Sequence, residues 1–175
     1  MTLKKIQTIS IFGTFILCFI THFLYSIFQN FVFSIFFPVN ESVWEHMKMI
    51  TSSILIWRII EYFILSKNHI KYNNYLFSTF IMCLLSIIIF LTIYYPIYSM
   101  VGESFILNVI CLFITIYFVN VIGYKIMISK NVKYGNIFGI LGIIIMYLAF
   151  TYLTYFPIKN ELFLDQQSNT YGINP

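Results

Sequence analysis

Long apolar segments separated by short polar connections dominate the chain. Runs near the roughly 20 residues that a helix needs to cross about 30 Å of hydrocarbon occur at residues 6–28, 42–65, 75–95, 104–128 and 136–156. We predict one membrane-spanning helix over each range, followed by a polar tail over 158–175. Since no internal repeat is visible and no loop has room for a soluble domain, we expect a single all-α transmembrane domain covering residues 1–175.

The stretch between the first two spans is apolar but short. Residues 31–37 end at Pro38, and a helix of that length rises only about 10 Å. We therefore predict a segment that lies in the membrane interface or dips back into the bilayer as a short helix. Pro96 and Pro157 are expected to end the third and fifth spans.

Composition supports a membrane protein and excludes other classes. The chain is 60% hydrophobic and 9% charged, with a mean hydropathy of +0.87, whereas soluble domains carry roughly 25% charged residues. The net charge of +4 does not indicate nucleic acid, because the basic residues occur a few at a time between the spans. We expect the lipid bilayer as the partner; the sequence does not indicate an oligomeric state. The cysteines each lie inside an apolar span, which indicates buried free thiols: Cys18, Cys83 and Cys111.

The distribution of lysines predicts the orientation. Lys159 is the one lysine outside the spans on its side of the membrane. By the positive-inside rule the N-terminus lies in the cytoplasm and the C-terminus outside, in a cell membrane. The acidic residues that agree with this orientation are Glu41, Glu103, Glu161 and Asp165. The lysines of the opposite, cytoplasmic side are Lys4, Lys5, Lys67, Lys71, Lys125, Lys130 and Lys133.

A polar stretch at residues 38–48 begins the second span. Charged groups near hydrocarbon cost several kcal/mol unless they are paired or wetted, so this stretch is a candidate functional site. One interpretation needs no ligand: Ser42 and Glu45 form a capping box, and Glu45 pairs with Lys48, which extends outward to water. The protein would then be a structural or accessory subunit.

A second interpretation adds His22 to the polar stretch. His22 lies about six residues, or roughly 9 Å, inside the outer end of the first span, and His46 lies at a similar depth in the second. Their imidazoles can meet if these consecutive helices are neighbours. Together with Glu45 or Glu41 they would supply donors that suit zinc or another divalent metal.

Two further hypotheses remain open. The same residues can line a polar cavity for a small ligand or ion, with Thr51, Ser52 and Ser53 deeper in the span. Alternatively, the protein is a membrane enzyme in which Glu45 and His46 act as general acid and base. Enzyme classes that need a nucleophile elbow, a phosphate loop or a dinucleotide fingerprint are excluded, because those motifs are absent from the sequence.

Other polar and small residues inside the spans predict helix contacts. Arg58 and Glu61 have the spacing of an ion pair within one helix. Asn108 and Asn120 are expected to form hydrogen bonds between helices. A stripe of small residues in the fifth span indicates close approach of a partner helix; it contains Gly135, Gly139 and Gly142.

The polar stretch resembles the signature of a family of small uncharacterised bacterial membrane proteins, known as a domain of unknown function, with the pattern Pro-Val-Asn-Glu-Ser-x-Trp-Glu-His. Matching residues are Pro38-Val39-Asn40-Glu41-Ser42-Val43-Trp44-Glu45-His46-Met47-Lys48, His22, Leu162-Phe163-Leu164-Asp165 and Tyr171-Gly172. The tail departs from the family pattern at Gln166, where that pattern has Pro.

The resemblance covers nearly the whole chain and implies no activity. It implies one shared outer-face feature that contains His22, Glu41, Trp44, Glu45, His46, Asp165 and Tyr171. Trp44 and Asp165 thus join the candidate ligand-binding residues. A tail that folds back over the second span would bring Asp165 to the cluster.

Overall fold

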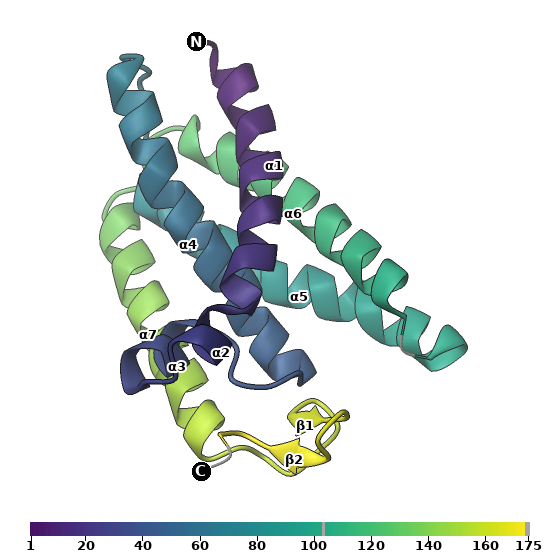
Figure 1. Ribbon diagram of the computed structural model, residues 1–175. Helices are drawn as coiled ribbons and strands as arrows, with labels where there is room; N and C mark the ends of the chain where they lie inside the picture. Colours follow the sequence, from purple (N-terminus) through teal and green to yellow (C-terminus); the bar gives the residue numbers. More distant parts are fainter. Residues whose placement is uncertain (103, 174–175) are drawn as a thin grey trace.

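The computed structural model describes residues 1–102 and 104–173, and it is all-α apart from one small hairpin (Figure 1). Five helices are long and apolar enough to cross a membrane, which confirms the predicted number of spans. Glu103, expected on the outer side, lies outside the described residues. The elements are α1 Leu3–His22, α2 Leu24–Ile27, α3 Phe31–Phe36, α4 Val43–Lys67, α5 Tyr75–Val101, α6 Phe105–Met127, α7 Gly135–Tyr155, β1 Leu164–Asp165 and β2 Thr170–Tyr171.

The first candidate span contains a break. It covers Leu3–Ile27, but α1 ends at His22 and α2 resumes after Phe23. The antiparallel hairpin of β1 and β2 lies at the end of the bundle opposite the N-terminus (Figure 1). We call this end the hairpin end. Because α1 ends there and α4 begins there, His22 and the polar stretch lie at the same end of the bundle.

Helix α4 is the most enclosed of the spans. Half of its most apolar window is buried in the protein, against 22–33% for α5, α6, α7 and the first span. It also carries the buried charges Glu45, Lys48, Arg58 and Glu61. The other helices therefore shield the polar groups of α4 from lipid, as the cost of exposing them to hydrocarbon requires.

The short α3 packs against α4 and α7, and its carbonyls bond to side chains of α4. Asn30 caps its N-terminus by accepting a hydrogen bond from the amide of Phe33. At its C-terminal end, the Ser34 carbonyl accepts a hydrogen bond from Lys48 (2.8 Å), and the Phe36 carbonyl accepts one from the Ser52 hydroxyl. These contacts satisfy carbonyls that the last turn of any helix leaves unpaired. A segment too short to cross the membrane is thereby stabilised beside α4.

Helix α5 differs from the prediction at Pro96. The expected end at residue 95 is wrong, because the helix continues through Pro96 to Val101. Proline removes one hydrogen bond within the helix, and membrane helices tolerate this loss where neighbouring groups satisfy the freed carbonyl. The longer helix carries Tyr98 to the hairpin end, where its hydroxyl accepts a hydrogen bond from Gln166 (2.7 Å).

Arg58 and Glu61 form the predicted ion pair in the half of α4 away from the hairpin end. Arg58 Nη1 lies 2.6 Å from Glu61 Oε1. Glu61 also accepts a hydrogen bond from Ser10 of α1 (2.8 Å), and Arg58 donates to Thr79 of α5 (3.0 Å). The pair therefore links three helices and leaves neither charge unpaired in the interior.

The two asparagines of α6 have different surroundings. Asn120 donates to the Ile116 carbonyl of its own helix (2.8 Å), so the expected bond between helices is wrong for this residue. Its amide oxygen is buried and lacks a hydrogen-bond partner among residues 1–102 and 104–173. Asn108 instead lines a cavity near the hairpin end. The free cysteines Cys18, Cys83 and Cys111 are all buried, as expected.

Gly139 marks the closest approach of α7 to α5. A Cβ atom added there would lie 2.4 Å from the Leu76 backbone carbonyl. The neighbouring glycines of the stripe also face α5, with Gly135 near Phe77 and Gly142 near Phe80. The predicted stripe of small residues is therefore a helix contact within the chain.

We predict that Gly139→Ala destabilises the protein by about 1–3 kcal/mol, because the added methyl group would force two helix backbones apart. Thermal unfolding of the purified protein in detergent would measure the loss. Ile140→Ala is the matched control, since Ile140 is 44% exposed on the same helix. Equal unfolding temperatures for the two variants would contradict the assigned contact.

Candidate functional site

At the N-terminus of α4, only one of the two hydrogen bonds of the predicted capping box forms. Ser42 Oγ accepts a hydrogen bond from the Glu45 amide (3.3 Å), which is half of a capping box. The other half is missing, because the Ser42 amide donates to Asn40 Oδ1 (2.9 Å). Glu45 Oε2 instead accepts a hydrogen bond from the Val39 amide (3.1 Å). The Glu45 side chain therefore holds the loop before the helix.

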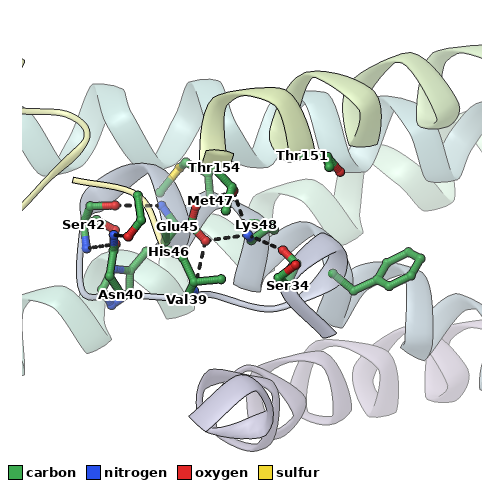
Figure 2. A network of polar contacts seen from close by, with 12 residues as sticks. Ser34, Val39, Asn40, Ser42, Glu45, His46, Met47, Lys48, Thr151 and Thr154 are labelled. Atoms are coloured by element: carbon green, nitrogen blue, oxygen red, sulfur yellow. Dashed lines mark hydrogen bonds and ion pairs between the residues drawn. The ribbon is translucent and has the colours of Figure 1, made fainter. Parts of the chain in front are cut away.

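Glu45 and Lys48 form a buried ion pair, with Nζ 2.6 Å from Oε2. The expectation that Lys48 extends outward to water is wrong, because its side chain is fully buried. Figure 2 shows Lys48 also donating to the Ser34 carbonyl and to Thr154 Oγ1 (2.9 Å). Thr154 in turn donates to Glu45 Oε1 (2.6 Å). We call these four residues, Ser34, Glu45, Lys48 and Thr154, the α4 anchor; it joins α3, α4 and α7.

Three side chains converge beside the α4 anchor. His22 Nε2 lies 3.3 Å from His46 Nε2 and 3.3 Å from Glu41 Oε2. His46 Nε2 lies 3.6 Å from the same carboxylate oxygen. The side chains are 22–38% exposed, so the group is reachable from outside the protein. We call His22, Glu41 and His46 the triad.

Local hydrogen bonds orient the triad. His46 Nδ1 lies 2.9 Å from the Ser42 carbonyl; since a carbonyl only accepts, Nδ1 carries a proton and neutral His46 presents a lone pair at Nε2. The hydrogen bond with His22 lowers the pKa of Glu41 below its usual range, although burial raises it. Glu41 is therefore an anion beside two imidazole nitrogens.

The C-terminal tail folds back onto the start of α4. The Trp44 amide donates to the Leu162 carbonyl (3.0 Å), and the Trp44 ring packs on Phe163 with centroids 4.9 Å apart. Asn40 Nδ2 donates to the Gly172 carbonyl (2.9 Å). The predicted fold-back of the tail therefore occurs, and it covers the loop that carries Glu41.

Gly172 and Asp165 shape the tail at this contact. Gly172 has a φ of +63°, and a Cβ there would lie 2.5 Å from the Thr154 carbonyl, so only glycine fits. Asp165 accepts hydrogen bonds from Ser168 Oγ (2.8 Å) and the Gln167 amide (2.9 Å). Burial raises the pKa of Asp165, but its hydrogen bonds, which include one with the Glu41 backbone, together lower the pKa by more, so the net shift is downward. Asp165 thus stabilises the hairpin turn.

The triad lies at the mouth of a cavity of about 430 Å³ between α1, α4, α5 and α6. Its inner wall is apolar and buried, with Cys18, Met49, Phe90 and Leu112. Two amide side chains join the triad among the lining residues, Asn108 from α6 and Gln167 from the tail. This volume falls within the roughly 300–1,000 Å³ of small-molecule sites.

The structure brings some candidate residues together and separates others. His22, Glu41 and His46 meet, whereas the Glu45 carboxylate bonds with Lys48, Thr154 and Val39 and not with His46 in the described part of the chain. Trp44 packs under the tail. Asp165 turns the hairpin and also bonds to the Glu41 backbone, so the fold-back brings it beside the triad. The hydroxyls of Thr51, Ser52 and Ser53 bond to helix carbonyls or to Tyr147 and Thr21, and none of the three lines the cavity.

The cavity residues themselves were not predicted. Phe90 and Leu112 look like any apolar residue of a span, so no sequence signal marks them. Asn108 was recognised as polar within a span, but it was expected to bond between helices. Gln167 follows the matched tail segment and carries no signal of its own.

This fold and site define an all-α protein with five helices long and apolar enough to cross a membrane, and with a polar cluster at the mouth of an apolar cavity. A family model described as "Family of unknown function (DUF6512)" matches residues 1–173, so the chain belongs to that family. No curated protein and no solved structure matches the chain.

We predict that Glu45→Gln and Lys48→Met each destabilise the protein by about 3–5 kcal/mol, because each leaves an unpaired buried charge. The double variant should be more stable than either single variant, since it removes both charges. Thermal unfolding in detergent would test this order. Lys67→Met, at an exposed position of the same helix, should change stability little; additive losses in the double variant would contradict the assigned pair.

Proposed function

We propose that this protein binds a divalent transition-metal ion of the zinc type through His22, Glu41 and His46. The spacing of the three donor atoms carries the proposal. Ligands about 2.0–2.1 Å from a tetrahedral zinc ion lie about 3.3–3.4 Å apart. The distances between the triad donors are 3.3, 3.3 and 3.6 Å, so an ion fits between them with little movement.

The chemistry of the donors supports the same ion. Two imidazoles and a carboxylate form a typical donor set for zinc. Metal-binding histidines usually donate their second ring N–H to a carbonyl or carboxylate, which fixes the tautomer. His46 has such a partner in the Ser42 carbonyl, 2.9 Å from Nδ1. The ionised Glu41 supplies the negative charge that offsets a divalent cation.

Three protein ligands leave one position of a tetrahedral ion open, as in zinc sites that bind a substrate or water. Since His22, Glu41 and His46 all line the cavity, we infer that this position faces it. The protein would then hold a small ligand in the cavity through the metal. Of the two carboxylates that the sequence-based hypothesis left open, Glu41 is the proposed ligand, because Glu45 is paired within the α4 anchor.

We further propose that the site faces the outside of a bacterial cytoplasmic membrane. The lysine distribution supports this orientation by the positive-inside rule. The termini lie at opposite ends of the bundle (Figure 1), as an odd number of spans requires. The triad is then accessible to metal ions outside the cytoplasm.

We expect the purified wild-type protein, loaded with zinc and desalted, to retain about one zinc ion per chain. His22→Ala and His46→Ala should each weaken zinc binding more than about 100-fold, since loss of a ligand costs more than loss of its hydrogen-bond partner. Metal analysis by mass spectrometry, together with competition by a zinc chelator, would measure both quantities.

His69→Asn is the matched control for these variants. His69 lies outside the triad, after the end of α4, and has a φ of +53°, which Asn tolerates. The control should retain zinc as the wild type does. Absence of zinc from the wild type, or equal loss in the control, would overturn the metal proposal.

The orientation predicts opposite labelling of two exposed lysine positions after replacement by cysteine. Lys159→Cys should react with a membrane-impermeant maleimide in intact cells, whereas Lys130→Cys should react only after permeabilisation. The native cysteines are at most 1% exposed and should give little background. The reverse pattern would place the triad on the cytoplasmic side.

A further inference from the structure

The lining of the cavity behind the triad contains two kinds of residue. Its polar groups come from His22, Glu41 and His46, with Asn108 and Gln167. Three lining phenylalanines are exposed on the surface of the bundle: Phe19 (39%), Phe23 (57%) and Phe105 (75%). Phe19 belongs to α1, Phe23 follows α1, and Phe105 begins α6. The Phe23 ring lies beside His22, with centroids 4.8 Å apart, so the apolar and polar parts of the lining adjoin each other.

The arrangement of the helices explains why a cavity exists there. In Figure 1, α5 and α6 run together away from α4 and α7 toward their shared connection. The cavity is lined by residues of α1, α4, α5 and α6, so it occupies the region from which this pair diverges. The exposed lining residues Phe19 and Phe105 lie on α1 and α6, so a hydrocarbon chain that entered from the bilayer would pass beside these two helices.

We propose, resting on the metal site of the proposed function, that the cavity binds a single-chain amphiphile with a carboxylate head, the chemistry of a long-chain fatty acid. Its chain lies along Cys18, Met49, Phe90 and Leu112, and its head takes the open metal position. The amide groups of Asn108 and Gln167 lie at the same mouth and can donate hydrogen bonds to the second carboxylate oxygen.

Charge balance selects a carboxylate over a phosphate head. A divalent ion with the Glu41 carboxylate leaves a net charge of about one positive unit, which a monoanionic head neutralises. A phosphate monoester carries nearly two negative charges at neutral pH and would leave an excess charge at the edge of hydrocarbon, where charge is costly. The cavity volume of about 430 Å³ is at the lower end of the usual range for ligand sites, which favours one chain over the two chains of a phospholipid.

The test uses the zinc-loaded full-length protein and measures binding of radiolabelled hexadecanoate in detergent. Hexadecanoate should bind at least about tenfold more tightly than hexanoate, because two additional buried methylenes already supply that factor. It should also bind more tightly than hexadecanol, which lacks the charge, and than hexadecyl phosphate. Removal of zinc should weaken hexadecanoate binding and leave hexadecanol binding unchanged.

Substitutions at two adjacent positions of α6 distinguish loss of the cavity from a general effect of a larger side chain on the helix. Val109→Phe fills the cavity, since Val109 lines it, and should weaken hexadecanoate binding about tenfold or more while zinc is retained. Ile110→Phe is the matched control, because Ile110 is 47% exposed and is not among the cavity residues. It should leave both ligands bound.

The outcomes distinguish the two proposals. A wild type without zinc overturns the metal site. Zinc binding with equal affinity for hexadecanoate and hexadecanol, or with preference for hexadecyl phosphate, overturns the carboxylate head. Equal affinity for hexadecanoate and hexanoate, measured on the wild type alone, overturns the chain site even if Val109→Phe fails to fold.

Discussion

The buried ion pair between Glu45 and Lys48 is the constraint on which the hairpin end of the protein depends. Two charges at the edge of hydrocarbon need complete pairing, because each unpaired charge costs several kcal/mol. The salt bridge of 2.6 Å provides only part of that pairing. Ser34 and Thr154 complete the partners of Lys48, and Val39 and Thr154 those of Glu45. The charges thus require that α3, α4 and α7 meet at one place.

The pairing of Glu45 and Lys48 also positions the triad, although neither residue belongs to it. The Glu45 carboxylate holds the Val39 amide, and Asn40 connects the loop to the tail through Gly172. The two residues that precede Glu41 are therefore held in place, while the Glu41 carboxylate stays available to the two histidines. The two glutamates have different roles. Glu45 is buried and fully paired, whereas the Glu41 side chain is 38% exposed. A partly exposed anion beside two imidazoles can exchange partners, and a buried pair cannot do so without a large loss of stability.

The sequence predicts the features that the bilayer determines, such as the number and length of the helices. It does not predict the features that depend on side-chain packing. Span length fixes the five helices, and depth along two consecutive spans placed His22 and His46 at the same level. The sequence does not predict the direction in which a side chain points. Lys48 is expected to extend toward water, but the Ser34 carbonyl of α3 and Thr154 bind it inside the protein. Pro96 and Asn120 show the same limit, because their outcome depends on which neighbours satisfy a carbonyl or an amide. The cavity was not predictable, since Phe90 and Leu112 differ from other apolar residues only in what they face.

The candidate site combines a rigid support with an adaptable mouth. Its support includes the α4 anchor and the contact of the tail with Trp44, whose ring lies between Phe163 (4.9 Å) and Phe150 (5.0 Å). The mouth is formed by groups from α1, the loop before α4, α4 itself, α6 and the tail. A ligand bound there would contact several of these segments at once, whereas each segment alone offers one polar side chain. Binding at this mouth therefore depends on the folded bundle, and the paired charges Glu45 and Lys48 hold the start of α4 and the loop before it in place through Ser34, Thr154 and Val39.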